Sequence, residues 1–338
     1  MSLLNKRRIA AAGLVAFHGV VLFAGFFAPY DPEAQHRMLT FAPPSRIRFV
    51  DAGNRLHLRP FVYGWKGTSG GPGDYQEDRT VRIPIRFFVN GAEYSLCGLF
   101  ACRRHFFGAD GPGRFFVMGT DGYGRDEFSR LLYGGRTSLF SGLFATAVSL
   151  SLGLLLGGMA GYFAGWVDEA VMRTAEIFMA MPWLYLLLTI RACLPLHINA
   201  TTIFVLLITL LGLLGWARPA RLIRGVVLSA KEREYVHAAR AFGATDAYLL
   251  RVHILPQARS VAVTQAALLI PQYIVAEVML SFFGLGIGEP ASSWGNMLAA
   301  LQEYSVLESD WWMFAPALAL AAVLLAYQRL FSRYAFTS

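Results

Sequence analysis

The chain has 338 residues, of which 55% are hydrophobic and 15% carry a charge. Soluble domains carry about a quarter charged residues, so this composition excludes an ordinary soluble domain and indicates a membrane protein. The formal net charge is +8, but the basic residues lie between separate apolar segments and not along one continuous face. A nucleic-acid partner is therefore not expected.

Six segments are apolar over roughly the 20 residues that a helix needs to cross a bilayer. They are residues 9–28, 139–163, 171–190, 200–217, 261–285 and 312–330. A cleaved signal peptide is the alternative for the first segment, but its apolar run would be only about 7–15 residues long, with a small-residue cleavage site after it. We therefore expect an all-α integral membrane fold of six transmembrane helices, in which residues 1–28 are the cytoplasmic N-terminus and the first helix.

Positive charge on the short loops predicts the orientation of these helices, because Lys and Arg collect on the cytoplasmic side. Residues 218–259 contain eight basic side chains, and Lys6, Arg7 and Arg8 precede the first helix. The short loops on the other side carry only Arg191, and residues 286–310 contain no Lys or Arg. Both termini are therefore expected in the cytoplasm.

Residues 29–136 are too long for a simple connector between helices, and parts of this segment alternate as strands do. Residues 46–50 and 55–59 alternate on either side of a turn at 51–54. After a Gly/Pro-rich break, two further strand-like runs flank Asn90-Gly91, which is a strong hairpin signal. We expect a small extracytoplasmic β subdomain of two hairpins inserted between the first and second helices.

Two cysteines lie within this expected subdomain. Cys97 and Cys102 are five residues apart, and this separation permits a disulfide in an oxidising compartment. The alternative is two unpaired thiols.

Residues 218–259 form a long basic segment with signals for two short helices. Ser229 and Glu232 have the spacing of a capping box, which predicts the start of the first helix. Gly243 predicts its end, because glycine adopts the left-handed conformation at the least cost. Thr245 is suited to cap a second helix through residue 250, and Pro256 predicts that this second helix stops. Two helices joined at a glycine elbow on the cytoplasmic side indicate a docking element.

Polar and small residues also occur within the apolar segments. Glu277 is the carboxylate expected deep in the fifth helix, where burial of charge is expensive. It is either a hydrogen-bonded packing residue or a residue that lines or gates a pathway. Pro182 and Pro271 predict bends in the third and fifth helices. The second helix has glycines at spacing four, which permit close helix contact: Gly153, Gly157 and Gly161.

The chain lacks the sequence motifs of the common enzyme classes. It contains no G-x-x-x-x-G-K-[ST] segment, so ATP is not bound in the manner of a P-loop, and it contains no H-E-x-x-H or C-x-x-C segment. Residues 67–71 fit G-x-S-x-G, but they lie in a glycine-rich loop and not between a strand and a helix. We predict no catalytic, cofactor-binding or metal-binding residues, and an energy source that a partner supplies.

Several motifs, in order, resemble the permeases of bacterial ABC importers, and in particular the second (C-type) subunit of the dipeptide, oligopeptide and nickel type. Ala238-Ala239, Gly243 and Leu255-Pro256 resemble the cytoplasmic E-A-A-x-x-x-G signature. Residues 119–126 resemble the G-T-D-x-x-G-R-D segment of that type. Further similar segments are residues 129–139, 161–168, 277–286 and 293–298. The resemblance extends from Met118 to the C-terminus and, more loosely, over the first helix and residues 28–32.

This resemblance implies a multi-pass permease of the bacterial inner membrane that forms half of a solute pathway. It implies three kinds of partner: a second, homologous permease subunit, two cytoplasmic ATPase subunits, which would bind ATP and Mg, and an extracytoplasmic solute-binding protein. Peptides are the solutes that it favours, with nickel complexes, opines or sugars as alternatives. The implied organisation is an external segment, 29–136, and a five-helix core, 137–338, with the ATPase-coupling loop at 218–259.

The resemblance also assigns the ATPase-coupling residues, which are Glu234, His237, Ala238, Ala239, Gly243, Leu255 and Pro256. His237 stands where the signature has Glu, so a carboxylate salt bridge to the ATPase is not implied, and either Glu234 or a partner of altered charge would replace it. Residues 41–116 have no counterpart in the family. The alternative function is a proton-coupled secondary transporter that uses Glu277, which would be expected to carry ionisable residues in several helices.

Overall fold

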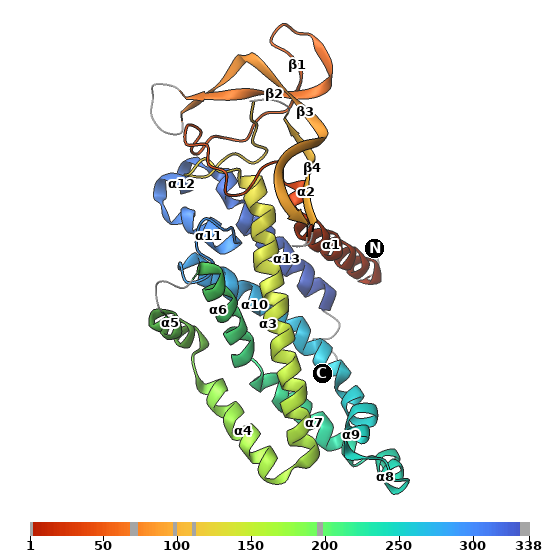
Figure 1. The fold of residues 1–338 in the computed structure, drawn as a ribbon. Coiled ribbons are helices and arrows are strands. Elements are labelled where there is room, and N and C mark those ends of the chain that lie inside the picture. Colours follow the sequence, from red (N-terminus) through yellow and green to blue (C-terminus); the bar gives the residue numbers. More distant parts are fainter. Residues whose placement is uncertain (1–2, 68–73, 97–99, 110–112, 195–198, 332–338) are drawn as a thin grey trace. The chain divides into compact units, whose positions relative to one another are not determined.

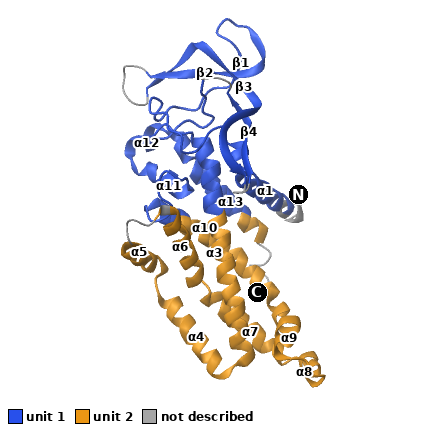
Figure 2. Ribbon diagram, in the orientation of Figure 1, with its two compact units in different colours: residues 1–139, 278–326 blue, residues 140–277, 327–338 orange. Residues whose placement is uncertain are grey.

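The computed structural model describes the chain except residues 1–2, 68–73, 97–99, 110–112, 195–198 and 332–338. Cys97 and most of the G-x-S-x-G segment lie outside the described residues. Two compact units are present: residues 1–139 with 278–326 form unit 1, and residues 140–277 with 327–338 form unit 2 (Figure 2).

Helices dominate the fold, as the composition predicts, and several are long and apolar enough to cross a membrane. Within the described residues there are four: Glu127–Phe163, Thr201–Lys231, Asp246–Phe282 and Trp311–Phe331. Helices α4 (Gly165–Ala180) and α5 (Trp183–Cys193) make a fifth span if the pair, bent by 82°, is counted as one. Pro182 lies at this bend, so the predicted bend in the third helix is confirmed.

Unit 1 combines short helices with a sheet. Its first helices are α1 (Leu3–Leu22), which contains a shorter apolar stretch at Arg8–Leu22, and α2 (Ala24–Phe27). Two short helices, α11 (Trp294–Ala299) and α12 (Tyr304–Ser309), precede α13 (Ala315–Phe331), whose last residues belong to unit 2. Single 3-10 turns at Ala300–Gln302 and Trp311–Phe314 join these elements.

Four antiparallel strands form the sheet, in the order β1-β2-β3-β4 (Figure 1). They are β1 (Arg48–Val50), β2 (Leu56–Gly67), β3 (Tyr75–Leu96) and β4 (Phe100–Ala109). One face of the sheet buries an apolar cluster made by Val62, Ile83, Ile85 and Phe115. The first predicted hairpin is confirmed, because Val50 of β1 pairs with Leu56 of β2 across the turn at 51–54.

The second predicted hairpin is wrong in its position. Asn90-Gly91 lies inside the continuous strand β3 and makes no turn. The pairing of β3 with β4 instead shifts its register between Asn90 and Tyr94. An irregular step in the strand thus takes the place of the predicted turn. Glycine fits at position 91 because a Cβ atom there would lie 2.6 Å from the His105 ring. Cys102, of the predicted disulfide, is partly buried on β4 and pairs in register with Tyr94.

Within unit 1, the sheet is fastened to the chain that follows α1. His105 of β4 is 2% exposed, and its Nδ1 lies 2.6 Å from the carbonyl oxygen of Ala28. Its Nε2 lies 2.9 Å from the carbonyl oxygen of Ala92. Phe106 packs on both Phe26 and Phe27, with ring centroids 5.9 and 5.7 Å apart. The bulged part of the sheet is therefore held against the end of the first helix.

Unit 2 is built on α3 (Glu127–Phe163), α6 (Ala200–Leu214), α7 (Ala217–Lys231) and α10 (Arg259–Phe282), together with α4 and α5. The start of α3 and the end of α10 belong to unit 1. Helix α3 begins earlier than the apolar segment 139–163 predicted. Helix α10 continues through Pro271 without a break, and a bend of the helix at this proline stays a prediction.

Helix α7 corrects the extent of the basic loop. The sequence suggested a loop from residue 218, but residues 217–231 form a regular helix. Its buried residues recur at helical spacing: Ala217, Ala220, Ile223, Val227 and Ala230. The arginines between them lie on the other faces, so a charged segment is here an amphipathic helix.

The glycines of the second predicted helix pack closely on α7. A Cβ atom at Gly157 would lie 2.3 Å from the carbonyl oxygen of Ala220, and one at Gly161 would lie 2.8 Å from the Val227 side chain. Because the first contact is with backbone, no side-chain rotation relieves it. Gly157 therefore sets the distance between α3 and α7.

We expect Gly157→Ala to destabilise unit 2 by roughly 1–3 kcal/mol, the usual cost of overpacking. The measurement is the thermal unfolding of the detergent-purified chain. Gly225→Ala on α7 is the matched control, because a Cβ there meets nothing within 4 Å, and helical alanine is favoured over glycine. Equal unfolding temperatures for the two variants would contradict this role of Gly157.

Candidate functional site

The segment between α7 and α10 forms a compact helical elbow in unit 2. Helix α8 (Glu234–Ala241) is followed by α9 (Asp246–Tyr248), a π-helical turn (Leu249–Ile254) and a 3-10 turn (Leu255–Ala258) that leads into α10. Two helices on either side of a glycine are thus present, as predicted. Their boundaries differ from the prediction at both outer ends.

The predicted capping box at the start of the first helix is wrong. Ser229 lies in the last turns of α7, and Glu232 is the residue that follows this helix. Helix α8 begins after Arg233, which is extended and makes no side-chain cap. The apolar face of α7 outweighs the local capping signal, because packing decides helix ends more strongly than propensity does.

Pro256 does not end the second helix. It lies at the start of the 3-10 turn, directly after the π-helical turn. Proline has no backbone N–H to donate to the preceding turn of a regular α-helix. Because the pitch of the helix changes at this point, that hydrogen bond is not required, and the chain continues into α10 with a local irregularity. This correction makes the elbow continuous with a membrane-length helix, Asp246–Phe282.

Gly243 forms the elbow as predicted. Its φ angle is +85°, the left-handed region in which glycine has the least strain. The N–H of Ala244 donates to the carbonyl of Ala239 at 3.1 Å, and the N–H of Gly243 donates to that of Arg240 at 3.0 Å. The Thr245 hydroxyl then accepts from the N–H of Tyr248 at 3.4 Å, which confirms the predicted cap of the second helix.

Apolar packing attaches the elbow to α3 and α7. Val236 of α8 is 1% exposed and belongs to a buried cluster with residues of α3, α7 and the π-helical turn. The other members are Tyr162, Ile223, Val227, Ala230, Leu249, Ile254 and Ala258. Helix α8 is therefore packed onto these helices and is not a free loop.

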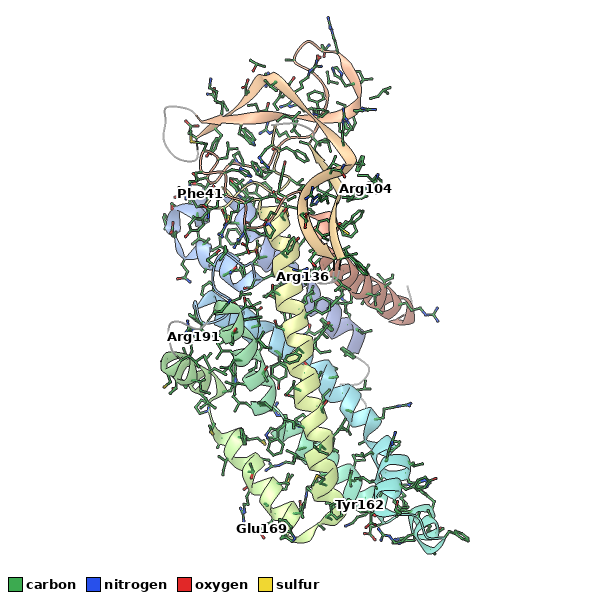
Figure 3. All side chains as sticks on the ribbon, in the orientation of Figure 1. Phe41, Arg104, Arg136, Tyr162, Glu169 and Arg191 are labelled. Carbon is green, nitrogen blue, oxygen red and sulfur yellow. The ribbon has the colours of Figure 1, made fainter. Side chains whose placement is uncertain are left out.

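A polar network adds to this attachment. The guanidinium of Arg240 donates to the Tyr162 hydroxyl at 2.8 Å and lies 3.5 Å from the Asp246 carboxylate. The Tyr162 hydroxyl donates to Asp246. Tyr162 stands at the end of α3 beside α8 and α9 (Figure 3). One tyrosine of α3 thus connects the two sides of the elbow.

Around Gly243 the surface forms an open groove of about 470 Å³. Its walls are Ala239, Phe242, Gly243, Ala244, Thr245, Tyr248 and His253. Phe242 is 93% exposed and Tyr248 is 50% exposed. A phenyl ring left almost wholly in solvent next to a groove is typical of an anchor for a partner protein.

The predicted coupling residues divide into exposed and packed ones. Glu234, His237, Ala238 and Pro256 are exposed. Ala239 is partly buried against the cluster of its own chain, as is Leu255. A larger side chain at Ala239 would therefore strain the elbow itself. His237 Nε2 lies 3.7 Å from a Glu232 oxygen, a pairing that is ionic only when His237 is protonated.

Sequence reasoning missed Phe242 and Tyr248 as surface residues, and Tyr162 as the attachment point. Phe242 and Tyr248 do not belong to the signature that assigned the coupling residues. The available signal was the position of Phe242 directly before Gly243, because this makes Phe242 the C-cap residue that follows the last residue of α8.

A second candidate site is a cavity of about 160 Å³ among the helices of unit 2. Its lining comes from α4, α5, α6, α7 and α10. The polar members of the lining are Arg218, Gln272 and Tyr273. The Tyr273 hydroxyl lies 2.6 Å from the Ser149 hydroxyl, which itself donates to the Gly212 carbonyl at 2.7 Å.

Glu277 is fully buried in α10 and does not belong to the lining of this cavity. Its role as a packing or pathway residue stays a prediction. In the described part of the chain, no three His, Cys, Asp or Glu side chains are grouped to hold a metal ion.

The G-T-D-x-x-G-R-D segment forms a buried ionic cluster within unit 1. Asp121 accepts from Arg125 Nε at 2.7 Å, and Arg130 Nη2 lies 3.3 Å from Glu289. Arg125 also pairs with Glu289. Asp126 accepts from the N–H of Ser129 at 2.9 Å, and burial raises the pKa of Asp126 to about 6. These contacts hold the start of α3 against the segment before α11. We therefore interpret the cluster as a stabilising one.

Comparison with known proteins identifies the family. Residues 153–334 match the binding-protein-dependent transport system inner membrane component family. The chain is 37% identical over 217 residues to the dipeptide transport system permease protein DppC of Bacillus subtilis (strain 168), which covers 64% of this chain and 66% of that protein. It is 37% identical over 210 residues to the oligopeptide transport system permease protein OppC of the same strain, covering 61% and 65%.

A glutathione transport system permease protein, GsiD of Pectobacterium atrosepticum, is 34% identical over 221 residues, which covers 65% of this chain and 71% of that protein. The matched region thus spans about two thirds of the length of these curated relatives. The resemblance stated from the motifs is confirmed. The chain belongs to the family of inner membrane components of binding-protein-dependent transport systems.

Proposed function

We propose that the chain is the transmembrane permease subunit of an ATP-driven importer and that it forms half of the solute pathway. Peptides are the proposed solutes, because similar chains are named as dipeptide, oligopeptide and glutathione permeases. The observation that carries the proposal is the exposed groove at Gly243 with its solvent-facing Phe242. An exposed apolar surface of this kind suits a protein partner.

The proposed partners are two cytoplasmic ATPase subunits at this groove, a second permease subunit and an extracytoplasmic solute-binding protein. When the ATPases close on ATP, they would displace α8. Because Val236 and the Tyr162 network hold α8 to α3 and α7, the displacement would reach the helices that line the cavity. Such coupling needs contacts that differ between two global states, and the groove is where this chain would make them.

We further propose six membrane helices, with α1 as the first, both termini in the cytoplasm and the sheet outside. The exposed phenylalanines near the bulge support this placement. Phe87 and Phe88 are 59% and 57% exposed, and they adjoin Phe106, which packs on α2. Aromatic side chains collect where a membrane helix meets the headgroups. Family membership does not favour the alternative of a proton-coupled transporter that uses Glu277.

The groove is tested by changing its most exposed residue. Phe242→Asp should leave folding and membrane insertion intact and reduce ATPase co-purification and solute-stimulated ATP hydrolysis at least tenfold, because a buried anchor of an interface contributes about 2 kcal/mol or more. Trp166→Asp is the matched control, since Trp166 is 80% exposed and lies outside the groove. Unchanged co-purification and coupling in Phe242→Asp would refute the docking assignment.

The shape of the elbow is tested at Gly243. A Cβ there meets nothing within 4 Å, so only the backbone conformation resists a side chain, by about 1–2 kcal/mol. Gly243→Val should therefore weaken coupling while the chain still folds, and Gly243→Asn should be milder because asparagine tolerates the left-handed region. Solute-stimulated ATP hydrolysis of the assembled complex is the measurement, and equal defects in both variants would contradict the conformational argument.

The orientation is tested with reporter fusions. A reporter in the exposed turn at Gly53, between β1 and β2, should report outside, and reporters after Ala230 and at the C-terminus should report inside. The reason is the concentration of basic residues in 218–259. A cytoplasmic signal from Gly53 would overturn the six-helix arrangement.

A further inference from the structure

Three arginines follow one another along α7 at spacing three, and they differ in their partners. Arg224 makes a bidentate pair with Asp168 of α4. Arg221 lies 3.5 Å from Glu176, also on α4. For Arg218, by contrast, no carboxylate in the described chain lies within ion-pair distance, and this exposed residue is among those that line the helical cavity.

The rest of the cavity wall is mostly apolar. Phe178, Met179, Met181, Trp183, Leu186 and Leu269 are among its lining residues. Two polar groups face this wall besides Arg218: the Gln272 amide and the Tyr273 hydroxyl. Since the Tyr273 hydroxyl is already bonded to Ser149, the guanidinium of Arg218 and the amide of Gln272 are the groups left to receive a ligand.

This combination is that of a ligand site. An apolar cavity with a few convergent polar groups is the usual form of a small-molecule site. Arg218, the second residue of α7, and Gln272 are both exposed, so a solute that enters this cavity can reach their polar groups. The guanidinium offers a planar fork of N–H donors that fits a carboxylate in bidentate fashion. The volume, about 160 Å³, is below the roughly 300–1,000 Å³ that holds a whole drug-sized ligand, so it suits one end of a solute.

We propose that Arg218, assisted by Gln272, binds the terminal carboxylate of the solute during its passage and so selects solutes that carry one. The proposal rests on the proposed function, since it names a subsite of the same pathway. Arg218 would determine specificity, because it would contact the solute directly. The paired arginines of α7 serve a different task, which is the contact between α7 and α4.

The first test varies the solute and leaves the protein unchanged. The complete complex, with its ATPases, second permease and binding protein, is reconstituted in vesicles and given alanyl-alanine or alanyl-alanine amide at saturating concentrations. Wild type should import the acid at least tenfold faster than the amide, because a hydrogen bond to a charged group is lost with the carboxylate. Equal maximal rates for the two compounds would overturn the subsite.

The second test asks whether the preference for the acid over the amide comes from Arg218 or from the binding protein. The binding protein is the same in every reaction, so only the permease variant changes. Arg218→Gln should lower the ratio of acid to amide import about tenfold or more, and Arg218→Lys, which keeps the charge without the fork, should lower it less. Arg221→Gln is the matched control and should keep the wild-type ratio, because Arg221 is not part of the cavity lining.

The outcomes separate the two proposals. If wild type shows no ATP-driven import of either compound, the proposed function fails. If wild type imports both and the ratio is unchanged in Arg218→Gln, then Arg218 only marks the cytoplasmic boundary of the helix or pairs with the second permease, and the subsite is refuted while the proposed function stands. If Arg218→Gln fails to assemble, the Arg218→Lys variant and the wild-type solute comparison decide the proposal. An unchanged ratio of acid to amide import in Arg218→Lys, or equal import of the two compounds by wild type, would then refute the subsite.

Discussion

The close contact between α3 and α7 is the constraint on which both candidate sites depend. Gly157 brings α3 against the backbone of α7 at Ala220, and the same approach places Tyr162 of α3 in the apolar cluster under α8. Without it, α8 would lose its tyrosine attachment, and α7 would no longer present its successive arginines to α4 and to the cavity. In a bilayer, where apolar surface gives helices little reason to associate, such small-residue packing is what holds two of them at a fixed distance.

The sequence was sufficient to predict the membrane class, most of the apolar segments, the first hairpin and the glycine elbow. Each of these follows from a local signal that tertiary structure does not override: composition, segment length, alternation, and the left-handed preference of glycine. The predicted count of six membrane helices is not confirmed by the structure. Among the described residues, four helices are long and apolar enough to span a membrane, and the bent pair at Pro182 makes a fifth if it is counted as one span; the apolar stretch of α1 is shorter.

In two of the failures, packing at a distance outweighed a strong local signal. Asn90-Gly91 became a bulge because β3 continues to pair with β4 beyond it. Ser229 lost its capping role because α7 has an apolar face that extends to Ala230. Pro256 failed to stop the helix because the preceding π-helical turn had already changed the pitch. In the candidate site, Ala239 was predicted as a coupling residue but is partly buried against its own chain, whereas Phe242, which the prediction did not include, is 93% exposed.

The irregular helix after the elbow has a consequence for how movement would pass through unit 2. The π-helical and 3-10 turns, Leu249–Ala258, lie between the groove and the regular part of α10, and they contribute Leu249, Ile254 and Ala258 to the cluster that also holds α7. Irregular turns of this kind are frequent at functional positions. A displacement of α8 therefore has two routes, one through the cluster into α7 with Arg218, and one through the irregular turns into α10 with Gln272. The two polar residues proposed to hold the solute carboxylate lie on these two helices, so any difference between the routes would change the distance between them.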